Sequence, residues 1–233
     1  MCIRDSVYVH LGKGVKLDFA EWCAALAAGR SYVSDGYAHL PSLKVNGVSP
    51  GYGEASLSEP GKVTVVAQVA FAPRTPEGVA YGTQQAEAGR AVIGDTVILH
   101  RERSEGWVSG GTREVEVIVN GKPVASQSVP ADGSTHRLEF TIPIDRSSWV
   151  AVRQFPQMHS NPVNVIVNGQ PIRASARSAR WCIEMTKLLW KNRERNIAES
   201  ERPAAREAFD HALATLEAIE AEASSPLGAA AGG

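Results

Sequence analysis

Apolar and polar residues alternate with a period of two along much of the chain, a pattern typical of half-buried β-strands. Residues 62–71, 113–120 and 137–144 show it most clearly. Residues 149–155 are apolar on both faces, which favours a central strand. Alternating strands separated by turn residues predict an antiparallel β-sandwich over residues 41–174. The residues expected to face its core are Val63, Val65, Ala67, Val69, Phe71, Val115, Val117, Val119, Leu138, Phe140, Ile142 and Ile144.

One strand-and-turn segment is repeated within this region. Residues 115–124 read VEVIVNGKPV and residues 163–172 read VNVIVNGQPI, and residues 43–48 (LKVNGV) are a shorter third copy. In each copy an alternating strand runs into Asn-Gly. This dipeptide suits a type I′ turn, because both central residues of that turn need a positive φ. The repeats therefore predict β-hairpins.

Before the sandwich, the sequence predicts a strand, a helix and a second strand within residues 7–40. Residues 7–11 form the first short strand. Asp18 and Glu21 have the spacing of a capping box, which marks the start of a helix. The helix is expected to end at about Ala28, with Gly29 after it, because glycine readily takes the left-handed conformation that follows many helices. A second strand then leads to a turn at Gly36.

The end of the sequence predicts a helical pair over residues 175–222. Residues 178–198 place Trp181, Met185 and other large apolar side chains at helical spacing. Ser200 is the N-cap candidate of the second helix, with Pro203 tolerated in its first turn. Residues 223–233 are small and rich in Gly and Ala, so we expect a disordered tail.

Composition argues against several classes of protein. The 233 residues carry a formal net charge of −1, so neither a nucleic-acid-binding surface nor a polybasic membrane surface is expected. No run of about 18 apolar residues is present, so we expect no membrane-spanning helix. The three cysteines have no C-x-x-C spacing, so neither a disulfide framework nor a zinc knuckle is indicated.

The first six residues have an unusual origin. MCIRDS resembles translated sequencing-adaptor sequence, as seen on open reading frames from environmental DNA. We therefore expect residues 1–6 to be artefactual and the chain to be a fragment whose natural start lies further upstream.

No short motif assigns a catalytic or metal-binding residue. The six histidines show no His-x-His, His-x-x-x-His or Glu-x-x-His spacing. Neither Gly-x-Ser-x-Gly nor a phosphate-binding Gly-x-x-x-x-Gly-Lys-Ser/Thr loop occurs. Candidate functional residues must therefore come from loops rather than from motifs.

The first candidate loop is residues 34–39, which follows a short strand. Asp35 and His39 could line a cleft, as an acid/base pair or in support of one. The alternative is an Asp-Gly turn with a histidine that has no chemical role.

The second candidate loop is residues 153–162, where a buried strand ends among polar groups. Arg153 offers a planar donor fork for an anion, which His159 and Asn161 could help to orient. The alternative is a structural loop in which Arg153 pairs with a local carboxylate.

Several segments together resemble a known family. They are residues 22–36, with AGRSYVSDG at their centre, and then KVNG (44–47), WVAVR (149–153), HSNPV (159–163) and WCI (181–183). Their order and spacing resemble the C-terminal portion of CehA/McbA-type metallohydrolases of the PHP (polymerase and histidinol phosphatase) superfamily. The resemblance covers most of residues 7–222.

The resemblance implies that residues 7–40 are the end of a catalytic α/β barrel. Such enzymes use divalent metal ions (Zn, Mn or Fe) to activate water, and their first ligand motifs would lie upstream of Val7. We therefore expect a non-catalytic accessory region that is inactive alone and whose partner is its own upstream barrel. No catalytic residue or metal ligand is assigned in this chain. Asp35, His39, Arg153 and His159 are the candidates for contacting substrate at the mouth of that barrel.

Two other functions stay open. The chain could be a stand-alone immunoglobulin-like or carbohydrate-binding sandwich, which exposed aromatic residues on one sheet face would favour. It could also be a small hydrolase that uses the loop with Asp35 and His39.

Overall fold

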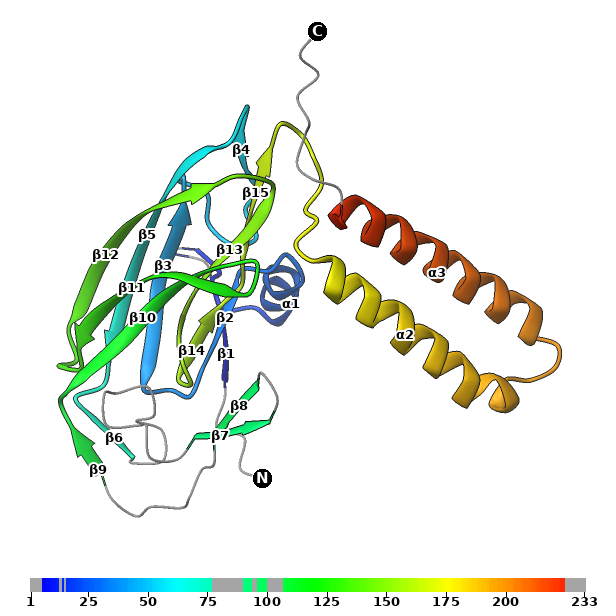
Figure 1. The fold of residues 1–233 in the computed structure, drawn as a ribbon. Helices are drawn as coiled ribbons and strands as arrows, with labels where there is room; N and C mark the ends of the chain where they lie inside the picture. The colour runs from blue at the N-terminus through cyan, green and yellow to red at the C-terminus, as the bar shows by residue number, and fades with distance from the viewer. Residues whose placement is uncertain are drawn as a thin grey trace, which may run out of the picture. The chain divides into compact units, whose positions relative to one another are not determined.

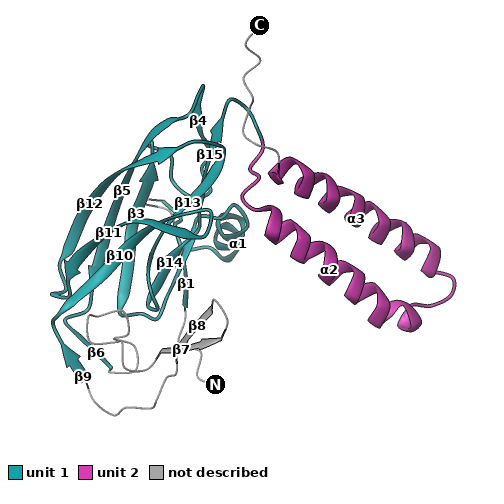
Figure 2. Cartoon of the chain, in the orientation of Figure 1, with its two compact units in different colours: residues 1–170 teal, residues 171–233 magenta. Residues whose placement is uncertain are grey.

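The computed structural model describes residues 6–12, 14, 16–76, 90–93, 96–99 and 107–224. The chain divides into two compact units, residues 1–170 and 171–233 (Figure 2). Most of the predicted artefact at residues 1–6, and most of the predicted tail at residues 223–233, lies outside the described residues.

The first unit is the predicted antiparallel β-sandwich, and its two main sheets are visible in Figure 1. The larger sheet has eight strands. Its main path is β1 (Ser6–Val9), β2 (Ser31–Ser34), β14 (Met158–Ser160), β13 (Ser148–Gln154), β10 (Thr112–Val119) and β11 (Lys122–Pro130), while β15 (Val163–Val167) pairs with β13 and with β4 (Ala55–Leu57). The smaller sheet has the order β12 (Thr135–Ile144), β5 (Gly61–Phe71) and β3 (Ala38–Val45).

Two short strand pairs accompany these sheets. One joins β6 (Arg74–Pro76) to β9 (Trp107–Ser109), and the other joins β7 (Arg90–Ile93) to β8 (Thr96–Leu99). Among the described pairings, only that of β15 with β4 is parallel. The fold is therefore mainly β with antiparallel sheets, as the alternation predicts.

The core lies between the two main sheets and is built from the alternating residues. On β5 the predicted core residues from Val63 to Phe71 are all buried. The same holds for Val115 and Val117 on β10, while Val119 packs against the core and is partly exposed. Strand β13 is buried on both faces and lies between β10 and β14, so its prediction as a central strand is confirmed.

The three Asn-Gly repeats all form turns, but only one forms a full hairpin. Asn46, Asn120 and Asn168 all have φ near +50°, and the glycine after each is also positive. After Asn120, β11 pairs back along β10 as predicted. After Asn168 no strand follows, and β15 pairs instead with β13 and β4. After Asn46 the return is limited to a single bridge between Val45 and Val48.

The predicted strand–helix–strand segment is present as β1, α1 (Phe19–Ala27) and β2. Asp18 caps the helix, because its Oδ1 accepts from the N–H groups of Ala20 and Glu21 at 2.9 and 3.1 Å. Gly29 follows the helix with φ +80°. β1 and β2 are antiparallel, whereas consecutive strands of an α/β barrel run parallel. β2 also pairs with β14, so residues 7–40 share one compact unit with the sandwich.

The second unit is the predicted helical pair, α2 (Ala176–Arg193) and α3 (Arg202–Ser224). The boundaries differ from those predicted, because Ser175 caps α2 and a short 3₁₀ turn, Glu194–Asn196, ends it early. α3 begins at Arg202 rather than directly after Ser200, and Pro203 lies in its first turn as predicted.

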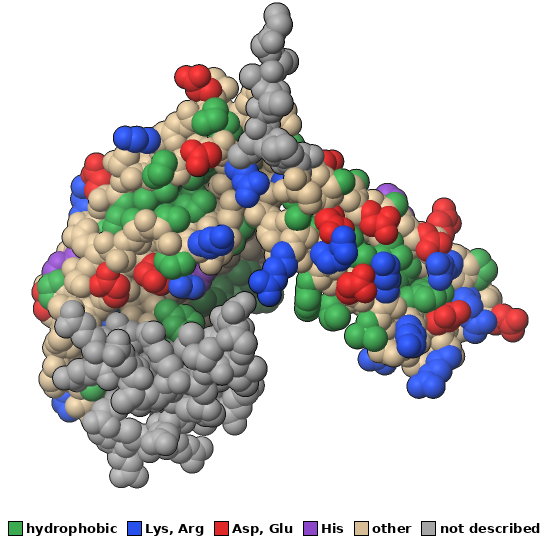
Figure 3. All heavy atoms as spheres, in the orientation of Figure 1, with side chains coloured by type: hydrophobic (Ala, Val, Ile, Leu, Met, Phe, Trp, Pro, Cys, Tyr) green, Lys and Arg blue, Asp and Glu red, His purple; other side chains and the backbone are tan. Residues whose placement is uncertain are grey.

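The rings of Trp190 and Phe209 pack 4.9 Å apart between these helices. Acidic and basic side chains are interspersed along the pair (Figure 3), and Arg180 pairs with Glu220 across it. Among the described helices, none combines the length and the apolarity needed to cross a membrane.

Candidate functional site

Two of the four predicted site residues lie side by side on the outer face of the larger sheet. Arg153 on β13 is directly opposite His159 on β14. The row continues on one side to Val33 and Val7, and on the other side to Glu116. Directly opposite residues in a sheet share a face, so these five residues form one transverse row. We call it the outer row.

Within the outer row, Arg153 pairs with a local carboxylate. Its Nε donates to Glu116 Oε2 at 2.7 Å, and both side chains are about a quarter exposed. The guanidinium also lies 5.8 Å from the centre of the Phe155 ring. His159 is exposed, and its Nδ1 donates to the carbonyl of Ser160 at 2.6 Å. Arg153 is therefore held in a structural pair with a carboxylate, the alternative to anion binding for this loop.

Asn161, the third polar residue of that loop, has a structural role. Its Nδ2 donates to the carbonyl of Gly29 at 3.0 Å and to Ser31 Oγ at 2.9 Å. These bonds fasten the loop to the end of α1 and the start of β2, so the amide is not available to orient a ligand at Arg153.

Asp35 is buried in a polar network between the sheets. Its Oδ1 accepts from the N–H of Tyr37 at 2.8 Å, as in an Asx turn, and Gly36 has φ +88°. Its Oδ2 accepts from Gln157 Nε2 at 3.2 Å. Gln157 Oε1 in turn accepts from Arg113 Nε at 2.9 Å. We call these connected groups the Asp35 network.

Arg113 is the centre of that network and is fully buried. Besides its bond to Gln157, its Nη2 donates to Thr75 Oγ1 at 3.1 Å and its Nη1 to the carbonyl of Thr112 at 3.1 Å. Burial lowers the pKa of Arg113, and the nearby charge of Asp35 opposes this shift. The arrangement stabilises a buried cation and leaves Asp35 no free oxygen for acid/base chemistry.

Sequence reasoning missed Arg113, although a signal was present. Arg113 is in phase with Val115 and Val117, whereas Glu114 and Glu116 alternate with them. An arginine at a core position of an alternating strand indicates a buried ion or hydrogen-bond network, because a lone buried charge is very costly.

His39, the fourth predicted residue, lies apart from Asp35 and among tyrosines. Its Nδ1 is hydrogen-bonded to the hydroxyl of Tyr32 at 3.0 Å, and its ring meets that of Tyr8 edge-on at 4.9 Å. Tyr8 and Tyr32 are cross-strand neighbours on β1 and β2, and their rings stack 5.0 Å apart. Burial raises the pKa of Tyr32.

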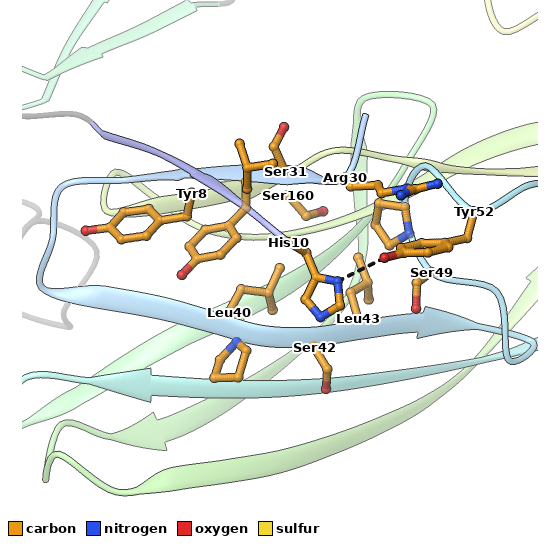
Figure 4. Close-up of a pocket in the computed structure, with 14 residues that line it drawn as sticks. Tyr8, His10, Arg30, Ser31, Leu40, Ser42, Leu43, Ser49, Tyr52 and Ser160 are labelled. Carbon is orange, nitrogen blue, oxygen red and sulfur yellow. Dashed lines mark hydrogen bonds between the residues drawn. The ribbon is translucent and has the colours of Figure 1, made fainter. Parts of the chain in front are cut away.

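Tyr8, whose ring stacks on Tyr32, lies at one end of a cavity of about 310 Å³ (Figure 4). Its walls come from β1, β2, β3 and the residues around position 50, segments that are far apart in the sequence. We call it the tyrosine cavity. The residues that line it are Tyr8, Val9, His10, Arg30, Ser31, Tyr32, Leu40, Pro41, Ser42, Leu43, Ser49, Pro50, Tyr52 and Ser160.

The opposite end of the tyrosine cavity is polar. The guanidinium of Arg30 lies over the ring of Tyr52, 4.2 Å from its centre, and Arg30 Nε donates to the carbonyl of Gly51 at 3.3 Å. His10 Nδ1 is hydrogen-bonded to the Tyr52 hydroxyl at 3.1 Å. This end therefore combines a fixed cation, an imidazole and a phenol.

The four predicted site residues do not fit a metal centre. Arg153 and His159 lie on the outer face, Asp35 lies in its buried network, and His39 lies beside the tyrosine cavity. Each has its own hydrogen-bond partner, so their donor atoms do not converge. Across the part of the chain that the structure describes, no group of three or more His, Cys, Asp or Glu residues could hold a metal ion.

No protein-family model matches the chain, and no curated protein matches it.

Proposed function

We propose that the sandwich is a non-catalytic accessory region of a metal-dependent hydrolase of the CehA/McbA type, attached to a catalytic barrel upstream of Val7. The segments that carry this resemblance in the sandwich support the proposal. Residues 29–36, 149–153 and 159–163 meet in the larger sheet, where β2, β14 and β13 are neighbours. These three segments form one continuous part of the larger sheet, while KVNG (44–47) lies at the end of β3 and WCI (181–183) on α2.

The observation that carries the proposal is an exposed apolar surface on the β1–α1–β2 segment. Leu17 and Phe19 are each 79% exposed, and Val7 and Val33 are 47% and 43% exposed. Val7 and Val33 are direct cross-strand partners in the outer row. Val7 and Val33 adjoin each other, and adjoining exposed apolar groups are typical of a surface for another protein domain. The resemblance implies an upstream barrel with divalent metal ions, and we propose that this barrel covers the apolar surface.

This surface would bring Arg153 and His159 near the barrel. Both follow Val33 in the outer row, so a barrel that covers Val7 and Val33 would border them. Asp35 then acts indirectly, by fixing the turn between β2 and β3. His39 belongs to β3 of the smaller sheet and contacts Tyr8 and Tyr32 of the larger sheet.

The first test is the coding sequence upstream of Val7. We expect an α/β barrel with His-x-His near its start. In the complete enzyme, alanine at Arg153 or His159 should lower turnover, while alanine at exposed Arg137 on β12 should not. An upstream region without a barrel would refute the proposal, and unchanged turnover in both variants would remove the two residues from the site.

The chain by itself provides a second test. We expect no hydrolysis of a nitrophenyl ester in the presence of Zn²⁺ or Mn²⁺. Metal-dependent turnover that disappears in Asp35→Asn or His39→Ala would instead favour the small hydrolase.

A second candidate function is a small-ligand-binding sandwich, and the tyrosine cavity is the observation that favours it. Three of the five tyrosines line the cavity. Their faces suit a sugar poorly, since Tyr8 and Tyr32 stack on each other and Arg30 covers one face of Tyr52. If the tyrosine cavity binds a ligand, that ligand belongs to a class other than sugars.

A further inference from the structure

We propose that the tyrosine cavity binds a small aromatic carboxylate, with the carboxylate at Arg30 and the ring toward Leu40 and Leu43. The inference rests on the second candidate function and is independent of the upstream barrel.

The charge of the cavity selects an anion. Arg30 supplies its cation, and none of the lining residues that the structure describes carries a carboxylate. Arg30 uses Nε for the carbonyl of Gly51, and its two terminal amino groups have no hydrogen-bond partner among the described residues. An arginine fork with free amino groups matches the two oxygens of a carboxylate.

His10 adds a donor near this fork, and Tyr52 fixes its tautomer. When the Tyr52 hydroxyl donates to His10 Nδ1, the proton of the imidazole is on Nε2, which can then donate to an anion. His10 Nε2 has no partner within the described chain. Figure 4 shows His10 hydrogen-bonded to Tyr52, and Arg30 lies over the ring of the same tyrosine, so the imidazole and the guanidinium flank Tyr52 at one end of the cavity.

The remaining walls select a flat apolar body. Leu40 and Leu43 are about 95% buried and belong to the sandwich core, and they line the cavity together with Pro41 and Pro50. The stacked pair of Tyr8 and Tyr32 closes the far end. An aromatic ring would gain apolar burial against these side chains and edge contacts with the tyrosines.

The size and rigidity of the cavity fit one small molecule. Its volume of about 310 Å³ is near the lower end for small-molecule sites, about 300–1,000 Å³. Arg30 is held in place before a ligand arrives, because its guanidinium stacks on Tyr52 and its Nε is bonded to Gly51. A fixed side chain loses little freedom on binding, which favours affinity.

Calorimetric titration of the full chain with benzoate tests the proposal, and benzamide is the neutral control of the same shape. We expect saturable binding of benzoate and at least about tenfold weaker binding of benzamide and of acetate, since each lacks one of the two recognised groups. Arg30→Gln should weaken benzoate binding by at least about tenfold, and Arg30→Lys by less. The matched control is Arg137→Gln, which removes an exposed arginine from the smaller sheet and should bind like the wild type.

Each other outcome overturns the proposed ligand class. Equal affinity for benzoate and benzamide would show that the negative charge of the ligand does not contribute to binding. Undiminished benzoate binding by a folded Arg30→Gln variant would show that Arg30 does not contact the ligand. If Arg30→Gln does not fold, the comparison of benzoate with benzamide on the wild type still shows whether the cavity requires a carboxylate. Binding of maltotriose but not of benzoate would keep the binding function and reject the aromatic carboxylate. If no probe binds, both the aromatic carboxylate and the ligand-binding function of the cavity are rejected. None of these binding results tests the proposal of an upstream barrel.

Discussion

Arg113 Nε donates a hydrogen bond to Gln157 Oε1 at 2.9 Å in the interior of the sandwich, and both side chains are almost completely buried. The bond joins β10 to the turn between β13 and β14. Through Gln157 it also reaches Asp35, at the end of β2. One cation therefore fastens three segments of the larger sheet.

We expect Arg113→Met to be strongly destabilising. The substitution keeps most of the apolar length but leaves Gln157 Oε1 and the buried Asp35 carboxylate without their positive partner. Loss of one member of a buried charged network costs about 3–5 kcal/mol. Urea unfolding followed by tryptophan fluorescence measures the change. Arg137→Met, on the exposed face of β12, should change stability by less than about 0.5 kcal/mol; equal effects of the two variants would contradict the network.

Gly51 is expected to tolerate no side chain, because it lies against the end of α1. A Cβ at this position would contact the carbonyl oxygen of Ala28 and would lie 2.7 Å from the backbone nitrogen of Arg30. Gly51→Ala should therefore cost about 1–3 kcal/mol through overpacking, in addition to the strain of a positive φ. Gly169→Ala is the matched control, since Gly169 has a similar φ of +65° but open space around it. Equal thermal shifts for the two variants would refute the close approach.

Tyr32 should ionise only at unusually high pH. Burial raises its pKa, and repulsion from Tyr8 adds to the shift. Because the folded-state pKa lies above the ordinary value of about 10, the contribution to stability is complete below that value and is lost as the pH rises through the folded-state pKa. Absorbance titration of the phenolates in wild type and in Tyr32→Phe gives the difference curve for this residue. A midpoint at or below the ordinary value would contradict the assignment.

Asp132 should titrate below the ordinary range of aspartate. Its Oδ1 accepts from His136 Nε2 at 2.9 Å, and this hydrogen bond is the largest cause that lowers its pKa, followed by the N–H of Ser134. The stabilisation is present above the ordinary pKa and is lost as the pH falls through the lowered value. Carbon NMR of the carboxyl group measures the midpoint. His136→Ala should raise it, whereas His211→Ala on α3 should leave it unchanged.

The candidate site was less predictable than the strands. The loop residues Arg153 and His159 were identified as neighbours, and they are direct cross-strand partners. Asp35 and His39 were paired on sequence proximity, but the turn at Gly36 sends them to different surroundings. Asp35 lies in the turn that follows β2, whereas His39 lies on β3 after the turn, so the reversal of the chain gives them different neighbours.

The sequence by itself determined the main alternating strands, the start of α1 and the turn conformations. Alternation, the Asp18 cap and the three Asn-Gly pairs are local, and local sterics and hydrogen bonds are sufficient to impose them. Tertiary structure alone decided how the chain continues after each turn, because Asn120 and Asn168 end nearly identical strands yet only the first has a partner strand to return to. It also decided the tyrosine cavity and the Asp35 network, whose members come from distant segments. Their proximity depends on which strands pair, and that choice is made by burial summed over the whole sandwich rather than by any short run of residues.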